Sequence, residues 1–594
     1  MSLISLIVLC VLMYAGRIFI ADFWPEAGTG EYILPVFETS DVHGAFAEHY
    51  MGSDKYMLAY ISDKVNDARS VGGGPDASRT VLIDGGDIFQ GSPASELLMG
   101  EPMLAIYDEM GYDAVSIGNH EFDWGLETVI DDDKTLRSYT LDGKTHDIKI
   151  PVVCSNLYRN GEKCSLAQDY VILEKTAHSE EDGDLNVRIA VIGFADDYST
   201  SVLSEAFEDL GYSIETDYDA LERLAKELES SGECDATIML AHGSAEKMAE
   251  RLGQDTCIDL VLGGHMHQRM SGRTGQGLRY AAPSGKAGAY VYTELVFEND
   301  GKGGAQLRVT EDDPDPEVYA LFDNLEVLAD TEENADELDH AVVELSNEFL
   351  GMADKMLGQE IGYITVPATK KYIDGSGRRA STAGNWITAA MMRAADADVV
   401  LYNAAGMRTN LEIAEGKDRR SVTLEDMYAM LPFNDGTYCY ELTYEELLGV
   451  IRYALTGRGR ALMTFIYGMD CYFIEDPADD RSSGNKYRRL LLDALVKDGE
   501  LIYRDGKWKD GWKDRKLILA VTEFTANTDR ESEGMNNPLC GYNDTGRLIS
   551  NEMPIRDGIL AELITEARQN DGLMSIDTEP HFKLGTYDGP DTLE

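Results

Sequence analysis

Short apolar runs alternate with helical stretches over residues 32–297, and each run ends in a polar or glycine-rich turn. Short runs of β-branched and apolar residues bounded by turns predict strands, whereas apolar residues spaced three or four apart predict helices. The pattern therefore predicts an α/β sheet that presents polar side chains at the carboxyl ends of its strands. The predicted strands are YILPVFETSD, TVLIDGGD, AVSIGNHE, NVRIAVIGFAD, ATIMLAHG and IDLVLGGHMH.

Two changes of pattern divide the rest of the chain. The segments NDGKGG and EDDPDPE form a turn-rich acidic break, and residues 318–357 predict mostly helix, with Leu321, Leu325 and Leu328 at helical spacing. From about Gly358 the pattern is mixed again, with a predicted helix AGNWITAAMMRAAD followed by a strand ADVVLYN. We expect one domain over residues 32–300, an acidic linker and helix over 301–357, and a second domain over 358–594.

The first 24 residues are an apolar segment interrupted by Arg17. The stretch of about 14 residues before Arg17 suits the hydrophobic region of a signal peptide better than the roughly 20 residues of a membrane span. If residues 18–24 are included, the segment could instead remain as an uncleaved anchor. Both interpretations favour export, to a periplasmic, cell-surface or extracellular location.

The charge of the chain excludes one large class of partner. Lys and Arg number 52 against 107 Asp and Glu, for a net charge of −55. Because nucleic-acid polymers and anionic membranes attract basic surfaces, we expect no nucleic-acid binding, and membrane contact only through the N-terminal segment. Eight cysteines are too few for a disulfide scaffold. Cys154 and Cys164 could form a disulfide in an exported protein, or remain isolated thiols.

Candidate chemistry gathers at the ends of the predicted strands. Five of the ten histidines lie in four short motifs there, and Gly85-Gly86-Asp87 ends another strand. Aspartate, asparagine and histidine without cysteine form a mixed oxygen and nitrogen ligand set, which suits Mn, Zn, Fe or a similar cation. The histidine motifs are Asp41-Val42-His43, Gly118-Asn119-His120-Glu121, the His242 of MLAHG, and Gly264-His265-Met266-His267.

Such a set can hold two cations. A carboxylate from Asp87 can bridge them, and cations about 3.5–4 Å apart can hold a hydroxide and neutralise phosphate oxygens. Any single GD or GH dipeptide arises readily by chance, and a lone histidine is usually structural. Several motifs in order, each after a strand-like run, nevertheless predict a two-metal centre.

The motifs TSDVHG, DGGDIFQGS, IGNHEFDWG and GGHMH resemble those of calcineurin-like metallophosphoesterases, in the 5′-nucleotidase branch that includes bifunctional UDP-sugar hydrolases. The resemblance implies a four-layer α/β/β/α core with two metals at the strand ends. It implies that one metal is held by Asp41, His43, Asp87 and His267, and the other by Asp87, Asn119, His242 and His265. It also implies that His120 stabilises the transition state and is oriented by Asp123, for which a simple turn residue is the alternative.

The third region resembles the C-terminal nucleotidase domain of the same family, in the segments RRASTAGNWITAAMMRAADADVVLYNAAGMRTNL and VTLEDMYAMLPFNDGTYCYELTYEELL. This resemblance implies an α+β domain that binds the nucleoside through Arg379, Asn403, Arg408, Phe433 and Phe524. Two departures stand out: NAAGMR replaces a loop with three glycines, and TANTDRES replaces a Gly-Gly-Asp turn. Core packing is the alternative role for both phenylalanines.

Together, these features predict an exported phosphohydrolase that uses two divalent cations (Mn, Zn, Mg, Co or Fe). We expect it to remove phosphate from nucleoside 5′-monophosphates by attack of a metal-bridging hydroxide. Hydrolysis of 2′,3′-cyclic nucleotides, nucleotide sugars or nucleoside polyphosphates is the alternative within the class. The alternative from another class is a non-catalytic surface protein that binds nucleotide or a partner. Loss of a ligand or of His120 would favour that last alternative, and every motif is intact.

Overall fold

The computed structural model divides the chain into two compact units, Met1–Ala353 and Asp354–Glu594. The predicted leader or anchor over residues 1–24 lies outside the described residues. Of the helices in the described part, none is long and apolar enough to cross a membrane. The structure describes residues 30–50, 53–71, 74–196, 210–299, 304–310, 314–321, 327–331, 334–371, 381–434, 436–456, 464–478, 489–527, 536–590 and 592–593.

The first unit is built on a mixed sheet of 13 strands among the described residues, in the order β16-β17-β15-β14-β12-β11-β1-β4-β5-β8, with β18 beside β1, β19 and β20. The strands β1, β4, β5 and β8 run parallel, as do β12, β14, β15 and β17. The bounds are β1 (Glu31–Thr39), β4 (Val81–Asp84), β5 (Ala114–Ser116), β8 (Val152–Val153), β11 (Tyr170–Ser179), β12 (Gly183–Ala195), β14 (Ala236–His242), β15 (Leu260–Leu262), β16 (Met270–Arg273), β17 (Arg279–Ala282), β18 (Ala289–Asn299), β19 (Ala305–Leu307) and β20 (Glu317–Ala320).

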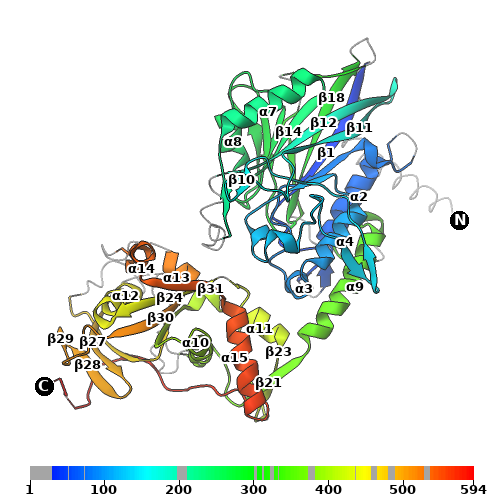
Figure 1. Ribbon diagram of the computed structural model, residues 1–594. Coiled ribbons are helices and arrows are strands. Elements are labelled where there is room, and N and C mark those ends of the chain that lie inside the picture. Colours follow the sequence, from blue (N-terminus) through cyan, green and yellow to red (C-terminus); the bar gives the residue numbers. More distant parts are fainter. Residues whose placement is uncertain are drawn as a thin grey trace. The chain divides into compact units, whose positions relative to one another are not determined.

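Alternating side chains of these strands face two separate cores. Val191 and Leu240 belong to an inner core with Val36 of β1, whereas Ile192 and Met239 pack outward against helices. Successive strand residues point to opposite faces, so this alternation makes sheet and helix layers. Figure 1 shows helices on both sides of the strands. They are α2 (Met57–Arg69) and α4 (Glu101–Met110) on one side and α7 (Tyr218–Ser231) and α8 (Ala245–Arg251) on the other.

The first unit also contains smaller elements, whose strands lie outside the 13-stranded sheet. They are α3 (Pro93–Leu97), β2 (Glu48–Tyr50), β3 (Ser53–Lys55), β6 (Tyr139–Leu141), β7 (Lys144–His146), β9 (Leu157–Arg159), β10 (Glu162–Lys163) and β13 (Tyr212–Ile214). Cys154 and Cys164 are both buried free thiols.

Among the described residues of the segment 318–357, the predicted helix is present over His340–Leu357. Val318 and Tyr319 lie instead in β20, which pairs with β18, and the helix α9 spans His340–Leu357. The prediction is wrong for residues 318–320, because Val318 and Tyr319 pair with β18 at the edge of the sheet. β-Branched and aromatic residues favour strands, and local helical spacing does not reveal such a long-range pairing. Leu325 lies outside the described residues, whereas Leu321 and Leu328 are buried.

The second unit contains two five-stranded sheets in its described part, ordered β25-β22-β30-β24-β31 and β29-β28-β27-β26-β32. One core joins them, with Leu401 of the first sheet and Phe473 of the second. The strands are β21 (Glu360–Ile364), β22 (Val399–Asn403), β23 (Arg420–Thr423), β24 (Gly436–Thr443), β25 (Thr464–Tyr467), β26 (Asp470–Glu475), β27 (Leu490–Lys497), β28 (Glu500–Arg504), β29 (Lys507–Trp508), β30 (Lys516–Thr522), β31 (Leu548–Pro554) and β32 (Phe582–Leu584).

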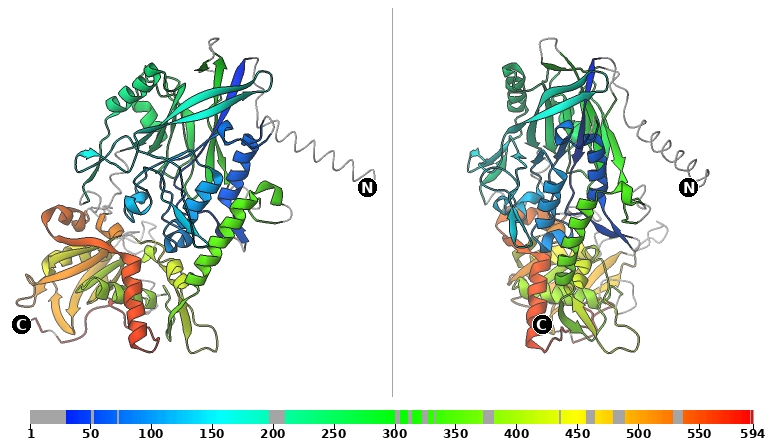
Figure 2. Two further views of the ribbon diagram at one scale, coloured as in Figure 1. Left: turned by 45° about the vertical axis from the view of Figure 1, so that its right-hand side comes forward. Right: turned by 90° about the vertical axis from the view of Figure 1, so that its right-hand side faces the viewer.

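One helix of the second unit corresponds to the helix predicted from the sequence. The predicted helix is α10, which begins after Ser381. The Ser381 side chain caps the helix by accepting a hydrogen bond from the Gly384 N–H. The predicted strand after it is β22. The α/β core and the second α+β domain are thus confirmed. The helices are α10 (Thr382–Ala394), α11 (Leu424–Met430), α12 (Tyr444–Thr456), α13 (Glu523–Asn527), α14 (Pro538–Tyr542) and α15 (Ile555–Gln569). The long red helix in Figure 2 is α15.

A histidine fastens β32 to β26 in this unit. His581 Nδ1 lies 2.8 Å from Asp470 Oδ1, and its Nε2 lies 3.0 Å from Asp577 Oδ2. Lys583 also pairs with Asp470 at 2.6 Å. Burial lowers the pKa of His581, but the hydrogen bonds to both carboxylates outweigh burial and raise it above its ordinary value. Both ring nitrogens face acceptors, so the charged ring fits this place best.

We expect His581→Gln to lower the free energy of unfolding by about 1–2 kcal/mol near pH 6 and by less near pH 9. A histidine whose pKa is raised by folding stabilises the fold fully below its unfolded value of about 6.5. That stabilisation is lost as the pH rises through the folded value. Denaturant unfolding of the full chain at both pH values measures the effect, with the exposed His340→Gln as control. A loss that does not change with pH would contradict the charged state.

Candidate metal centre

The polar motifs meet because the strands that precede them are neighbours in the sheet. Thr39 pairs with Asp84 and Asp84 with Val115 in parallel register, so the turns after β1, β4 and β5 leave the same edge. Backbone hydrogen bonds join the turns: the Asp41 N–H donates to Gly86 O at 2.8 Å, and the His43 N–H donates to Asp87 O at 2.9 Å. The strand ends therefore position the predicted ligands by main-chain contacts.

The backbone at this edge is strained. Left-handed conformations occur at five non-glycine residues here, with φ between 50° and 67°. Such a conformation costs about 1–3 kcal/mol at each non-glycine residue and persists where the surroundings enforce it, most often at functional sites. Five such residues at one edge of the sheet therefore agree with a functional centre there. The residues are Asp41, His43, Asp87, His265 and His267.

One cluster of donor atoms contains Asp41, His43 and His267, all within 4.8 Å of one another. His43 Nε2 lies 3.1 Å from His267 Nε2, and His267 Nε2 lies 3.3 Å from Asp41 Oδ1. Asp87 Oδ2 is 3.9 Å from His43 Nε2. Two imidazole nitrogens and two carboxylates that converge in this way form a cradle for one divalent cation.

A second cluster contains Asp87, His242 and His265. Asp87 Oδ2 lies 3.3 Å from His242 Nε2. The Asn119 Oδ1 atom lies 3.2 Å from His242 Nε2 and 3.0 Å from His265 Nδ1. A single oxygen of Asp87 thus faces both clusters, so this carboxylate is placed to bridge two cations.

Hydrogen bonds to backbone carbonyls orient two of the histidine rings for metal binding. His43 Nδ1 lies 2.8 Å from Gln90 O, and His242 Nδ1 lies 2.9 Å from Gly85 O. A carbonyl only accepts, so each ring donates from Nδ1, and the neutral ring then has a lone pair on Nε2, the atom that faces the cluster. Metal-ligating histidines usually have such a partner on their other nitrogen. The residues therefore fit two divalent cations that share Asp87.

Neighbouring charges shift the pKa values of these side chains in opposite directions. Burial lowers the pKa of His242, but the Asp87 carboxylate outweighs it and the pKa rises to about 10. Burial and the nearby His242 lower the pKa of His265 to about 4. Strongly perturbed groups in one cluster are typical of functional sites. Cations bound here would favour neutral histidines and ionised carboxylates.

His120 and Asp123 lie at the edge of the clusters. His120 Nδ1 is 2.8 Å from Asp123 Oδ2, and the His120 ring lies 5.1 Å from that of His43, centre to centre. The side chains of His120 and Asp123 are 31% and 35% exposed, so a substrate can reach them. Burial lowers the pKa of His120, but the Asp87 and Asp123 carboxylates raise it to about 10.

The sequence assigned no role to one buried acid, Glu121, although it belongs to the GNHE motif. Its carboxylate accepts hydrogen bonds from the backbone N–H groups of Asp87, Ile88 and Gly118. Burial and the Asp87 carboxylate raise the pKa of Glu121 to about 7, against the effect of the N–H donors. The only signal for Glu121 in the sequence was its position directly after His120, the predicted catalytic histidine.

The predicted nucleoside residues gather at one end of the first sheet in the second unit. Thr437 pairs with Thr522, and the Gly436 N–H donates to Glu523 Oε2 at 3.1 Å, so Phe433 and Phe524 lie at the same strand ends. These two rings are 42% and 45% exposed, which argues against core packing for either.

Two more of the predicted residues belong to this end of the sheet. Arg408 lies 5.1 Å above the Phe433 ring. Asn403 ends β22, which runs parallel to β30. Arg379 lies outside the described residues.

The two alanines that depart from the family loop fit without strain. Ala404 and Ala405 form a short helical turn, and Asn403 Oδ1 accepts a hydrogen bond from the Ala405 N–H at 3.1 Å. Neither alanine has a positive φ. The loop therefore needs no glycine at these two positions.

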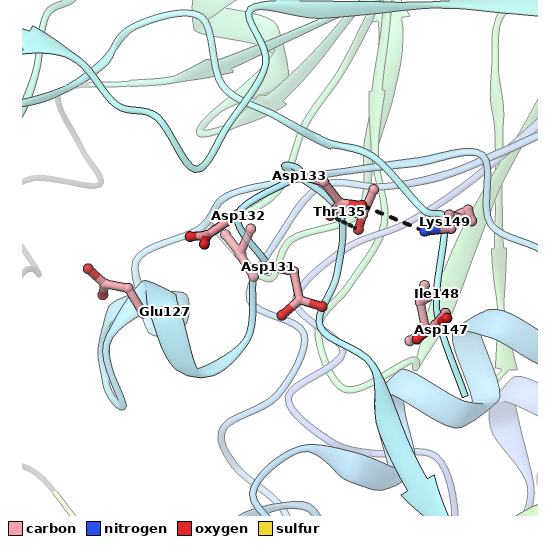
Figure 3. Close-up of a pocket in the computed structure, with 9 residues that line it drawn as sticks. Glu127, Asp131, Asp132, Asp133, Thr135, Asp147, Ile148 and Lys149 are labelled. Carbon is pink, nitrogen blue, oxygen red and sulfur yellow. Dashed lines mark hydrogen bonds and ion pairs between the residues drawn. The ribbon is translucent and has the colours of Figure 1, made fainter. Parts of the chain in front are cut away.

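A separate acidic pocket in the first unit contains none of the predicted ligands. Figure 3 shows its carboxylates from Glu127, Asp131, Asp132, Asp133 and Asp147, with Lys149 paired to Asp133 at 3.6 Å. Asp133 also accepts a hydrogen bond from Thr135. Solvated acidic side chains of this kind are ordinary on so anionic a protein, and we assign no site here.

Comparison with known families agrees with this geometry. Residues 34–269 match the calcineurin-like phosphoesterase family and residues 360–486 match the 5′-nucleotidase C-terminal domain. One family match thus lies in the first unit and the other in the second, and the predicted resemblance is confirmed. Calcineurin-like metallophosphoesterases use two divalent metals.

Individual relatives are distant. The probable 5′-nucleotidase of Treponema pallidum is 22% identical over 590 residues, covering 85% of this chain and 92% of the relative. The endonuclease YhcR of Bacillus subtilis is 24% identical over 74% of this chain, and the match spans only 34% of YhcR, about a third of its length. A putative 5′-nucleotidase from Staphylococcus aureus has the same fold, with a TM-score of 0.58, 16% identity, and coverage of 93% of this chain and 99% of that one.

Proposed function

We propose that this protein is an exported, metal-dependent phosphohydrolase that releases phosphate from nucleotides, above all from nucleoside 5′-monophosphates. The observation that carries the proposal is the pair of donor clusters that share Asp87 Oδ2, with the His120–Asp123 pair beside them. Export rests on the apolar N-terminal segment of the sequence.

Different side chains of the first unit would bind the two cations and contact the phosphate. Asp41, His43, Asp87 and His267 would hold one cation, and Asp87, Asn119, His242 and His265 the other. The chemistry that bound divalent cations supply is polarisation of phosphoryl oxygens and activation of water for in-line attack. Asp123 accepts from His120 Nδ1 and supports the charged ring, which donates from Nε2 to an oxygen of the reacting phosphate.

The second unit would bind the nucleoside. Two half-exposed rings, Phe433 and Phe524, supply faces on which a base can stack, and stacking tolerates different bases. Arg408 packs over Phe433 and keeps its N–H groups for polar contacts. Asn403 uses its oxygen on the Ala405 N–H, so its amide N–H groups remain for the ligand. Arg379 remains a prediction from sequence.

Phosphate release from a panel of nucleotides tests the proposal. The panel contains nucleoside 5′-monophosphates, 2′,3′-cyclic nucleotides, a UDP-sugar and ATP, each with Mn²⁺, Zn²⁺, Mg²⁺ or Co²⁺. We expect the highest kcat/KM with a 5′-monophosphate. A preference for cyclic nucleotides or UDP-sugars would replace that substrate by the alternative. Metal binding without hydrolysis of any member would support a non-catalytic nucleotide-binding protein.

We expect Phe433→Ala to raise KM for nucleotides about 5- to 150-fold, because base stacking contributes about 1–3 kcal/mol. Hydrolysis of an aryl phosphate, which has no base, should change little. Steady-state kinetics on both substrates measure the effect, with Ile549→Ala, another exposed apolar residue of this unit, as the matched control. Equal losses on both substrates would make Phe433 a structural residue.

A further inference from the structure

Glu121 lies beneath the cation clusters and is only 3% exposed. Its Oε2 accepts hydrogen bonds from the Asp87 N–H at 2.9 Å and the Gly118 N–H at 2.7 Å. Its Oε1 accepts from the Ile88 N–H at 2.8 Å. One carboxylate therefore binds both backbone amides that flank the Asp87 α-carbon, together with an amide from the turn after β5.

The bound segment is strained and tightly packed. Asp87 has a φ of 59°, a left-handed conformation that is strained for a non-glycine residue. Gly118 lies so near that a Cβ added there would be 2.3 Å from Asp87 Oδ1. The turns after β4 and β5 therefore touch at this point. Glu121 joins them through its three N–H donors, and Asp87 Oδ1 joins them by accepting a hydrogen bond from the His120 N–H at 2.8 Å.

From these contacts we propose that Glu121 is a positioning residue, which holds the backbone of Asp87 so that Asp87 Oδ2 faces both cation clusters. The inference rests on the proposed function only in that the clusters bind divalent cations. Glu121 belongs to none of the donor-atom clusters among the described residues, so its contribution is orientation rather than metal ligation. Substitution of a residue that orients a metal ligand typically lowers metal affinity about 10- to 100-fold.

Glu121→Gln tests the inference with almost no change of shape. The amide that replaces one oxygen donates instead of accepting, so it opposes at least one of the three backbone N–H groups. We expect Mn²⁺ to bind the metal-stripped full-length variant about 10- to 100-fold more weakly by calorimetry. We also expect saturating Mn²⁺ to restore most of kcat, because no reacting group has been removed.

The matched control is Glu127→Gln, six residues further along, where the carboxylate is exposed and paired with Arg159. It should bind Mn²⁺ like the wild type. Wild-type Mn²⁺ affinity in Glu121→Gln would overturn the inference. If that variant does not fold, Glu121→Asp keeps the charge but falls one methylene short, and wild-type affinity there would overturn it equally. Because calorimetry needs no turnover, a wild type that binds Mn²⁺ but hydrolyses no nucleotide would contradict the proposed function alone.

Discussion

Asp87→Asn is expected to abolish phosphate release and to reduce bound cations at both clusters together. Asp87 Oδ2 faces His43 Nε2 at 3.9 Å and His242 Nε2 at 3.3 Å, so a neutral amide removes the charge that both clusters share. The loss should exceed about 100-fold in kcat/KM and in metal affinity, the upper end for residues that only orient a ligand. Elemental analysis and phosphate-release assays on the same preparation measure both quantities.

The control for this variant is Asp133→Asn, which removes a carboxylate from the acidic pocket of Figure 3. It should leave metal content and activity unchanged, because that pocket shares no residue with the two clusters. Asp87→Asn that keeps both cations and normal turnover would refute the bridging assignment.

His120→Ala is expected to lower kcat about 100- to 1000-fold with little change in metal content. This is the usual effect of removing one donor that stabilises the charge of a transition state. The prediction separates two roles for His120, catalytic residue and metal ligand. A ligand role is the rival because donor atoms of His43, Asp87 and His120 also lie within 4.8 Å of one another. The hydrogen bond from Nδ1 to Asp123 argues for the catalytic role.

Metal analysis beside single-turnover kinetics distinguishes these roles. Asp123→Asn should lower kcat in the same direction and less strongly, because the ring remains but loses its charged partner. A fall in metal content that parallels the fall in kcat of His120→Ala would make His120 a ligand instead.

Local sequence patterns were sufficient for the strands that carry the motifs. β1, β4 and β14 each contain an apolar run, and buried parallel strands require such runs because helices or a second sheet cover both faces. The motif residues follow the strand ends directly, so their convergence could be expected from parallel topology alone. The helix α10 was predictable from its sequence pattern, and the structure adds Ser381 as its N-cap.

Long-range pairing explains what the sequence could not show. β18 lies beside β1 although about 250 residues separate them. β18 also pairs with β20, and this second pairing makes a strand of Val318 and Tyr319. The left-handed backbone at Asp87 depends on contacts with Glu121 and Gly118 from another turn. Such contacts have no signature in local periodicity, so the role of Glu121 emerged only from the structure.

Titration of the metal-stripped protein with Mn²⁺, with bound metal and phosphate release from a nucleoside 5′-monophosphate recorded together, tests the central claim most directly. The account predicts no release without metal and full activity as bound Mn²⁺ approaches two ions per chain. Phosphate release by metal-free protein, or two bound ions without release from any nucleotide, would contradict it.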